Sequence, residues 1–388
     1  MVIYKKKEVS MKKIGIIAEY NPFHNGHLYQ IEEVKKKYPD SILIVVMNGN
    51  FTQRGEVTLF DKWTRTEFAL KNGIDLVIEL PYPFSTQSAD YYAEGAMTIL
   101  ETLGCDTVIF GSESNQIDTL TEIAKAGLDE EVGKLVKVYC KLGNNYPTAI
   151  SLAIEETTGK KVDTPNDLLG VSYIKAILKN KFQIKPETIQ RTSDYHSKEA
   201  NNSIASASAI REMIKEQKDY SFYVPKNTIQ NNLIFHDTDD YFPLLKYKIL
   251  TDNNLEQYQT VDETYCKKLK KEILSSNSRE ELIQRIKRKH DTYNKISRML
   301  LHILCGFTKE KAKEFQKIPY LRVLGFNQAG RSYLNQIKKQ LPIPLISKIT
   351  KEKDNMLEYE METSKIYDIP YHGDSYEKEY KKNKKEDI

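Results

Sequence analysis

Hydrophobic residues in the first half of the chain fall into short runs separated by longer amphipathic segments. The β-branched apolar runs cover residues 14–18, 42–47, 76–80 and 107–110. Consecutive apolar residues over so short a length are typical of strands buried on both faces. The segments between them that carry apolar residues at helical spacing cover 27–37, 62–71 and 89–103. This alternation predicts a doubly wound α/β fold with a parallel sheet, of the kind that binds nucleotides.

A further helix and strand follow before the pattern changes. The segment Thr164-Pro165-Asn166-Asp167 has a capping residue, a proline in the first turn and a carboxylate three residues after the cap, so it predicts a helix start. The later elements that we expect in this half are a strand over 182–190 and a helix over 206–215. From about residue 220 strand-like runs become rare, and segments such as 256–274 and 279–304 carry the helical period.

With 388 residues the chain exceeds the usual size of one domain, so we expect two. The predicted parts are an N-terminal extension over 1–10, an α/β catalytic domain over 11–218, a mostly helical domain over 219–376 and a disordered charged tail over 377–388. The extension is basic but lacks the apolar stretch of a secretory signal. Because Met11 opens the first strand pattern directly, we expect Met11 to be the functional start.

Composition narrows the class of protein. The chain is 40% hydrophobic and 29% charged, as in ordinary globular proteins. Its longest clearly apolar run, over 41–47, is far too short to span a bilayer, so no membrane association is expected. The four cysteines, Cys105, Cys140, Cys266 and Cys305, lie far apart without the spacing of a zinc or redox motif. We therefore expect reduced thiols in a cytoplasmic protein.

The net charge of +4 conceals an uneven distribution. Residues 281–350 contain 15 Lys and Arg against 4 Asp and Glu, so the remainder of the chain is acidic. A basic C-terminal part favours a polyanionic partner. The alternative is a solvated lysine-rich helical surface, and charge alone does not separate the two.

The candidate chemistry lies where the first strand ends, at Glu19-Tyr20, and the chain reads Asn21-Pro22-Phe23-His24-Asn25-Gly26-His27 before a helix begins. In an open α/β sheet such a turn lies at the carboxyl edge, where helix N–H groups favour phosphate. Gly26 allows close backbone approach, and His24 and His27 are expected to donate to phosphate oxygens as pyrophosphate leaves. The alternative is a pair of capping histidines. Zinc is disfavoured because no further ligand follows at a recognisable spacing.

This His-x-Gly-His turn resembles the signature of the nucleotidylyltransferase superfamily, which implies a Rossmann-like catalytic domain. A second signature of that superfamily, a Ser/Thr-rich helix start that ends in a basic residue, is similar to Ser206-Ala207-Ser208-Ala209-Ile210-Arg211. An arginine in the first helical turn opposes the helix dipole, so a triphosphate beside it would explain its position. The alternative is an exposed arginine next to a serine cap.

Longer stretches narrow the resemblance. Residues 18–27, 49–56, 61–65, 79–81 and 110–113 together are similar to the tRNA(Met) cytidine acetate ligase family, over nearly the whole chain from Met11. The resemblance implies that acetate attacks the α-phosphate of ATP to give acetyl-adenylate. It further implies that the acetyl group passes to the wobble cytidine of elongator tRNA(Met), forming N(4)-acetylcytidine.

The resemblance also implies the site residues. The catalytic residues would be His24, His27 and Arg211. The ATP contacts would be Ile17, Ala18, Glu19, Tyr20, Asn21, Pro22, Phe23, His24, Asn25, Gly26, His27, Leu28, Tyr29, Gln30, Gly111, Asn166, Arg191, Ser206 and Arg211. Gly111 has the alternative of a plain turn glycine, Asn166 that of a first-turn polar residue, and Arg191 that of a surface arginine.

Two further groups of residues follow from position and charge. Residues 50–65 come after the second strand, and we expect acetate or the incoming cytidine to contact Gln53, Arg54, Lys62, Trp63 and Arg65. For the single tryptophan, Trp63, a half-buried packing role is the stronger alternative. In the helical part basic residues interleave with aromatic ones, which suits an RNA surface. The resemblance, rather than this pattern, makes tRNA the favoured polyanion. The tRNA contacts expected there are Arg285, Lys287, Arg288, Lys289, Arg322 and Arg331.

We expect Mg²⁺ to be held mainly by the ATP phosphates and water, without a dedicated ligand cluster. No stable protein partner is evident. One alternative is another adenylyltransferase of the same fold acting on a small cofactor precursor, which leaves the basic helical part without a role. Another is a noncatalytic RNA-binding protein that retains a nucleotide-binding fold.

Overall fold

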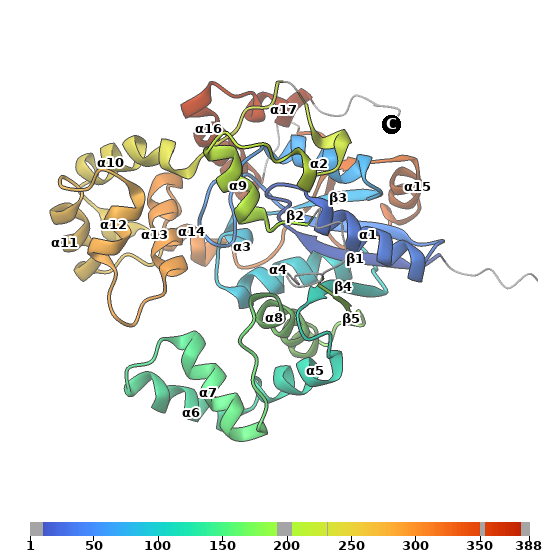
Figure 1. Ribbon diagram of the computed structural model, residues 1–388, viewed down its shortest axis with the longest axis horizontal. Helices are drawn as coiled ribbons and strands as arrows, with labels where there is room; N and C mark the ends of the chain where they lie inside the picture. The colour runs from blue at the N-terminus through green and yellow to red at the C-terminus, as the bar shows by residue number, and fades with distance from the viewer. Residues whose placement is uncertain (1–10, 192–203, 231, 350–353, 382–388) are drawn as a thin grey trace, which may run out of the picture.

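The computed structural model describes residues 11–191, 204–230, 232–349 and 354–381 (Figure 1). Its centre is a seven-stranded sheet with the order β5-β4-β1-β2-β3-β6-β7. The strands are β1 (Lys13–Ala18), β2 (Ile42–Asn48), β3 (Leu76–Leu80), β4 (Thr107–Ser112), β5 (Lys185–Gln190), β6 (Leu321–Phe326) and β7 (Leu345–Ile346). The first five pair in parallel, whereas β6 runs antiparallel to β3. The predicted α/β fold with a parallel sheet is confirmed.

Strand β2 shows why the sheet forms from these residues. Ile42, Ile44 and Val46 pack into one core cluster, while Leu43 and Val45 pack into another on the opposite face. Successive side chains of a strand point to opposite faces, so a continuous apolar run buries both. The run is therefore a central strand.

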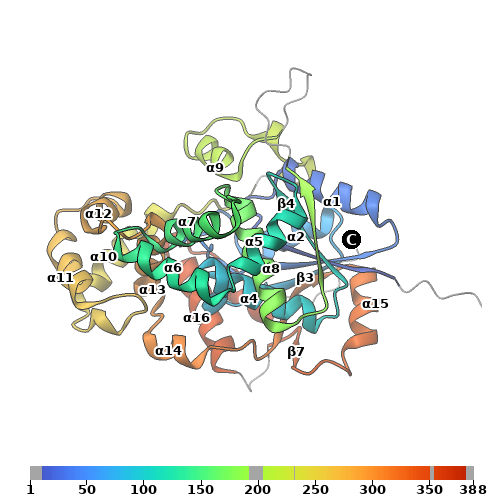
Figure 2. The same ribbon diagram turned by 90° about the horizontal axis from the view of Figure 1, so that it is seen from below.

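Helices cover both faces of the sheet. On one face lie α1 (Asn25–Lys37) and α2 (Lys62–Lys71), and on the other α4 (Ala89–Thr102), α8 (Pro165–Asn180) and α15 (Gln328–Ile337). Figure 2 shows α1 and α15 on opposite sides of the strands. Helix α8 begins where the Thr164-Pro165 pattern predicts. Among the residues that the structure describes, no helix is long and apolar enough to cross a membrane.

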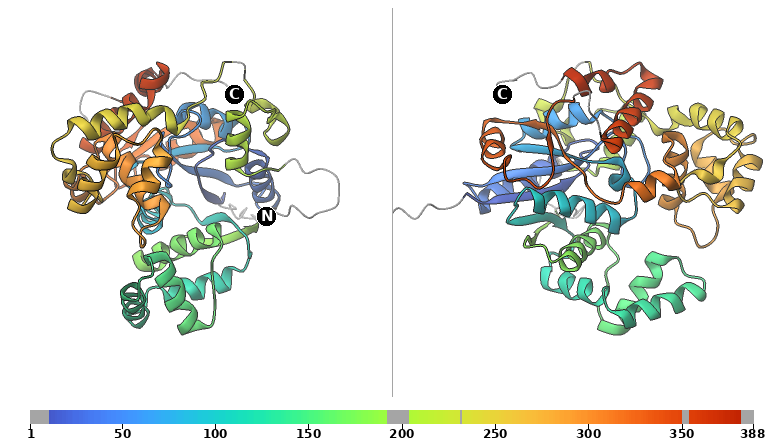
Figure 3. Two further views of the ribbon diagram at one scale, coloured as in Figure 1. Left: turned by 60° about the vertical axis from the view of Figure 1, so that its left-hand side comes forward. Right: turned by 180° about the vertical axis from the view of Figure 1, so that it is seen from behind.

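Two helical parts extend from this centre. One is a lobe of α10 (Phe242–Thr251), α11 (Glu263–Glu272), α12 (Arg279–Ile286) and α13 (Tyr293–Cys305). The other is a hairpin of α6 (Glu130–Lys141) and α7 (Tyr146–Thr158), which projects away from the sheet (Figure 3). The interior of the lobe is continuous with the core behind the sheet, because Ile249, Leu269 and Leu300 belong to the same buried cluster as Ile44.

The last part of the chain differs from the predicted domains. After the lobe and α14 (Lys309–Glu314), the chain returns to the sheet with β6, α15 and β7, so residues 219–376 are not one helical domain. Helices α16 (Asn355–Asp368) and α17 (Ser375–Lys381) follow. The predicted disordered tail is therefore wrong for residues 377–381, because Glu379 on α17 is buried among charged partners. Residues 1–10 and 382–388 lie outside the described part.

Candidate active site

The carboxyl ends of β1 and β4 define the position of the site. Strand β1 is flanked by β2 on one side and β4 on the other. From β1 the chain runs outward through β2 and β3, then crosses to β4, so the connections leave this point in opposite directions. Open α/β sheets bind ligands in the crevice at such a switch point. The turn Glu19 to His24 lies there, between β1 and α1.

His24 and His27 form a stacked pair at the start of α1. Their ring centroids are 3.7 Å apart. The Nδ1 atom of His24 accepts a hydrogen bond from Gly26 N at 3.0 Å, and His27 Nδ1 accepts one from His24 N at 3.2 Å. A neutral imidazole that accepts at Nδ1 carries its proton on Nε2. Both histidines therefore present Nε2–H donors.

The surroundings keep both rings neutral. Burial and, to a smaller extent, the Arg191 guanidinium lower the pKa of His24 to about 3. Burial, His24 and Arg191 hold the pKa of His27 well below its usual value. A neutral pair donates hydrogen bonds without exchanging protons near pH 7. The arrangement fits stabilisation of an anion better than general base catalysis.

Contacts with the two histidine rings explain why a glycine and two aromatic residues occur beside them. A Cβ atom at Gly26 would lie 2.9 Å from His24 Cε1, so glycine allows the imidazole to fold back over the helix start. The N–H groups of Gly26 and His24 are engaged by the two imidazoles, so both histidines cap α1 and these two N–H groups are not free for phosphate. Tyr20 and Phe23 are buried and contact the His27 ring, with centroid distances of 4.8 and 5.6 Å. They fix the orientation of His27.

The second signature, residues 206–211, lies next to the histidine turn in the structure. Ser206 caps α9 (Ala207–Lys215) by accepting a hydrogen bond from Ala209 N at 3.1 Å. From this helix Arg211 donates to the carbonyl oxygen of Asn21 at 2.8 Å and lies 3.3 Å from Glu56. The guanidinium is thereby placed at the turn that carries the histidines.

Residues after β4 and β5 complete this side of the crevice. Arg191 Nη1 donates to Asn166 Oδ1 at 3.3 Å, and Asn166 Nδ2 donates to Glu113 at 2.5 Å. A Cβ atom on Gly111 would lie 3.1 Å from Arg191 Cγ, so the glycine leaves room for that side chain. Sequence reasoning missed Glu113 as a site residue. Its position directly after a strand, in Gly111-Ser112-Glu113, was the available signal.

The other predicted ATP contacts line the same strand–turn–helix unit. Ile17 and Ala18 end β1 and are partly buried. Asn25 Nδ2 donates to the carbonyl oxygen of Phe222 at 3.0 Å, and Gln30 Nε2 donates to that of Ile109 at 3.4 Å. The remaining members of the set are Pro22, which is buried in the turn, and Leu28 and Tyr29, which are partly buried on α1.

Of the five predicted substrate contacts in residues 50–65, two are accessible to solvent and three are buried in the protein interior. Gln53 is partly buried and Arg54 is exposed, so both lie near the crevice. Lys62, Trp63 and Arg65 are at most 1% exposed. The hydrogen-bond and ion-pair partners of these three are Glu79, Glu379, and the carbonyl oxygens of Ser375, Glu19, Asn48, Gly49 and Phe60. The structure contradicts a substrate-contact role for these three residues.

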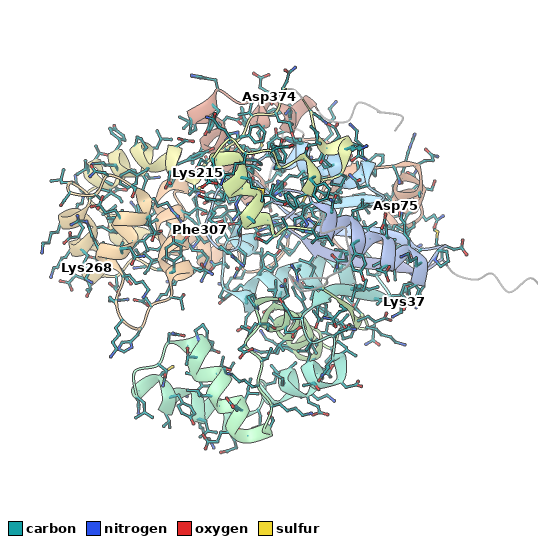
Figure 4. The ribbon with its side chains drawn as sticks, viewed as in Figure 1. Lys37, Asp75, Lys215, Lys268, Phe307 and Asp374 are labelled. Atoms are coloured by element: carbon teal, nitrogen blue, oxygen red, sulfur yellow. The ribbon has the colours of Figure 1, made fainter. Side chains whose placement is uncertain are left out.

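The predicted tRNA contacts do not form one surface. Arg322 is 1% exposed and pairs with Glu379 at 3.2 Å, so the structure contradicts its role as an RNA contact. Arg331 is exposed on α15, next to the end of the sheet where Asp75 lies. Figure 4 shows Asp75 at the opposite end of the molecule from Lys268, which belongs to the helical lobe.

The lobe carries the other four residues. Lys287 and Lys289 are exposed in the connection between α12 and α13. Arg285 pairs with Glu281 at 2.5 Å, and Arg288 pairs with Asp291 at 2.7 Å and lies over the Tyr265 ring. Internal pairing thus occupies the two arginines, while the lysines project from the surface.

The donor set suits a polyphosphate. Two neutral imidazole donors and the guanidinium groups of Arg191 and Arg211 lie around the turn between β1 and α1, and arginine matches phosphate geometry. In the described ranges, no group of three or more His, Cys, Asp or Glu side chains is placed to hold a metal ion.

Comparison with known proteins shows relatives that match this chain over nearly its whole length. The model of the family named HIGH Nucleotidyl Transferase matches residues 11–383. The tRNA(Met) cytidine acetate ligase of Geobacillus sp. (strain WCH70) is 40% identical, over 92% of this chain and 94% of its own. The protein of that name from Bacillus subtilis (strain 168) is 35% identical, over 93% and 92%.

Two crystal structures also match this chain over nearly its whole length. Apo Thermotoga maritima TmcAL is 27% identical and aligns with a TM-score of 0.85, over 95% of this chain and 98% of that chain. Thermotoga maritima TmcAL bound with alpha-thio ATP is 27% identical, with a TM-score of 0.83 over 94% and 95%. The chain therefore belongs to the HIGH nucleotidyl transferases and to the tRNA(Met) cytidine acetate ligase family.

Proposed function

We propose that this protein is an ATP-dependent ligase that acetylates the wobble cytidine of elongator tRNA(Met). It first joins acetate to AMP with release of pyrophosphate, and then transfers the acetyl group to the cytidine amine to form N(4)-acetylcytidine. The observation that carries the proposal is the stacked, neutral His24–His27 pair beside Arg191 and Arg211. The resemblance of the whole chain to named ligases supports the choice of substrates.

The geometry accounts for the first step. An acetate oxygen attacks the α-phosphorus of ATP, and the bond to the bridging oxygen of pyrophosphate breaks. Negative charge grows on the phosphate oxygens as this happens, so the fixed Nε2–H donors of His24 and His27 stabilise the transition state more than the ground state. Arg191 and Arg211 hold the charged groups in position.

The metal and the cell compartment are inferred from this chemistry. Mg²⁺ held by phosphates and water would supply additional positive charge at the triphosphate. Because the substrates are ATP, acetate and tRNA, we infer a cytoplasmic protein.

One reaction mixture tests the function. Purified protein is mixed with ATP, Mg²⁺, labelled acetate and a tRNA(Met) transcript without modification, and label in the tRNA is measured. We expect incorporation that requires ATP, releases AMP and pyrophosphate, and maps to the wobble cytidine. A tRNA(Met) transcript with uridine at that position is the matched control and should stay unlabelled.

Two other results would overturn the proposal. Adenylylation of a small cofactor precursor without acetate would identify a different adenylyltransferase of this fold. Binding of tRNA without any turnover of ATP, at saturating acetate and Mg²⁺, would identify a noncatalytic RNA-binding protein.

A further inference from the structure

The transfer step requires a group that accepts a proton, and the carboxylates at the crevice differ in their availability. Glu113 accepts hydrogen bonds on both oxygens, from Asn166 and from the N–H of Asp167. Asp167 likewise accepts on both, from Ser112 and from Ser114 N. Glu56 is paired with Arg211 at 3.3 Å. These three carboxylates already have structural partners.

Glu19 is held on one side only. Its Oε1 accepts hydrogen bonds from Gln53 N at 2.8 Å and from Asn48 Nδ2 at 3.2 Å. Oε2 receives no hydrogen bond from the residues that the structure describes, and the side chain is partly exposed. One oxygen therefore fixes the carboxylate, while the other remains available as an acceptor.

The support behind Glu19 is rigid. Asn48 is fully buried, and its Oδ1 accepts a hydrogen bond from Tyr92 at 3.0 Å. Arg65, also fully buried, donates to the carbonyl oxygens of Glu19 at 2.7 Å and of Asn48 at 3.1 Å. A buried and satisfied network of this kind holds a side chain in one geometry.

Its place in the sheet puts Glu19 directly after β1, at the switch point between β4 and β2. Gly111, Asn166 and Arg191 lie on the β4 and β5 side of β1, whereas the partners of Glu19, Asn48 and Gln53, lie on the β2 side. Adenosine on the first side leaves the second side for the acyl acceptor. Glu19 lies between the two, within reach of both.

We propose that Glu19 is the general base of the acetyl-transfer step, an inference that rests on the function proposed above. The cytidine amine nitrogen forms a bond to the acetyl carbonyl carbon. The bond between that carbon and the phosphate oxygen breaks, and its electron pair leaves with AMP. The proton released by the nitrogen moves to Glu19 Oε2, so atoms and charges balance without a further reactant.

The electrostatic surroundings suit this role. Burial raises the pKa of Glu19, the hydrogen bond from Gln53 N opposes the shift, and Glu56 adds to it. Arg54 and Arg211 lower the pKa, and the other ionisable groups that face Glu19 are Tyr92, Tyr173 and Arg65. A carboxylate with a raised pKa is a stronger base, yet it remains ionised above that pKa.

Two half-reactions separate this role from a structural one. Acetate-dependent exchange between ATP and labelled pyrophosphate reports adenylation, and a single-turnover assay with unmodified tRNA(Met) transcript reports transfer. For Glu19→Gln we expect exchange to fall much less than transfer, because adenylation of acetate needs no base for the cytidine amine. Transfer should fall by about 10²- to 10³-fold, because general bases contribute on that scale.

The pH profile adds a second measurement. In the parent protein the transfer rate should rise with pH along an acidic limb that reports Glu19, since only the ionised carboxylate accepts the proton. Glu19→Asp should keep the limb with slower transfer, whereas Glu19→Gln should lose it. Glu33→Gln, a change at a partly exposed residue of α1 that pairs with Lys36, is the matched control and should behave like the parent.

Each outcome is decisive. Transfer by Glu19→Gln at the parental rate would overturn the inference and leave the proposed function intact. A proportional loss of exchange and transfer would overturn it as well, because Glu19 would then serve adenylation or folding. Absence of acetate-dependent exchange in the parent would instead overturn the proposed function.

Discussion

At the scale of single residues, the direction of two protons decides what the His24–His27 pair does. Each Nδ1 accepts a backbone N–H, so the Nε2–H groups point away from the helix backbone as donors. Removing one such donor from an oxyanion site typically costs about 10²- to 10³-fold in rate. The same loss is expected here.

His24→Ala and His27→Ala should each lower the rate of acetate-dependent ATP–pyrophosphate exchange by about 10²- to 10³-fold. Binding of tRNA, measured by filter retention, should change by less than about threefold, since neither residue lies on the helical lobe. Wild-type exchange rates in either alanine variant would contradict the assigned role.

The exchange reaction should also lack a histidine ionisation near pH 6.5. The pKa of His24 is lowered to about 3, so the ring is already neutral throughout pH 5.5–8. A rate that falls on acidification with an apparent pKa near 6.5, and that loses this limb in His24→Ala, would show that a charged imidazole matters instead.

At the scale of elements, helix α13 of the lobe holds the loop that supports Glu19. Gly55 O accepts hydrogen bonds from Arg279 at 2.7 Å and from Ser297 at 2.9 Å, and Gln53 O accepts one from Arg298 at 3.2 Å. Gly55 has a φ of +84°, and a Cβ atom there would overlap the backbone nitrogen of Arg298. The loop and the helix therefore meet backbone to backbone.

Gly55→Ala should destabilise the protein by at least about 2 kcal/mol, because backbone strain and overlap with α13 act together. Acetyl transfer should fall more than thermal stability alone explains, since Gln53 N positions Glu19. Urea unfolding and the single-turnover assay measure the two effects.

The control for this change is Gly159→Ala. Gly159 also has a positive φ, of +66°, but no atom lies within 4 Å of its added Cβ. Its substitution should cost only the backbone strain, about 1 kcal/mol, with transfer unchanged. Equal losses in both variants would show that contact with α13 contributes nothing.

Elements defined by local pattern were predictable, and those that depend on distant partners were not. Leu43 and its neighbours form an apolar run that is typical of a buried strand, and the turn was recognisable from the spacing of His24 and His27 together with their position after the first strand. By contrast, β6 contains Arg322, whose charge looks like a surface feature until Glu379 is placed beside it. Lys62 was misassigned for the same reason, because its partners come from β3 and α17.

At the scale of the whole molecule, a buried ionic cluster joins the beginning of the chain to its end. Lys62 lies 2.7 Å from Glu79 and 2.5 Å from Glu379, and Glu379 also contacts Arg322. Burial alone would lower the pKa of Lys62, but these carboxylates and Glu360 raise it. The lysine therefore remains charged in the interior.

Glu379→Ala should destabilise the protein by about 3–5 kcal/mol, because it leaves Lys62 and Arg322 buried with too little negative charge. Urea unfolding followed by circular dichroism measures the change. Asp374→Asn, at an exposed residue on the same side of the molecule, should shift stability by about 0.5 kcal/mol or less. A similar shift in both variants would show that the cluster is energetically unimportant.

The separation of the basic residues predicts which surface meets tRNA. Lys287→Glu with Lys289→Glu should weaken tRNA affinity and reduce the salt dependence of log K by about 1.5 units, as expected for two lost phosphate contacts. Arg331→Glu, at the far end of the sheet, should leave both quantities unchanged. The reverse pattern in filter binding at several salt concentrations would place the RNA over α15.

The location of Glu379 has a consequence for protein synthesis. A ribosome delivers the chain from its N-terminus, so the histidine turn, Arg191 and Arg211 all emerge before β6 and α17. Until then Lys62 has only part of its carboxylate partners, and the segment that supports Glu19 lacks its final packing. Prematurely terminated chains should therefore carry every nucleotide-binding residue and still fail to consume ATP.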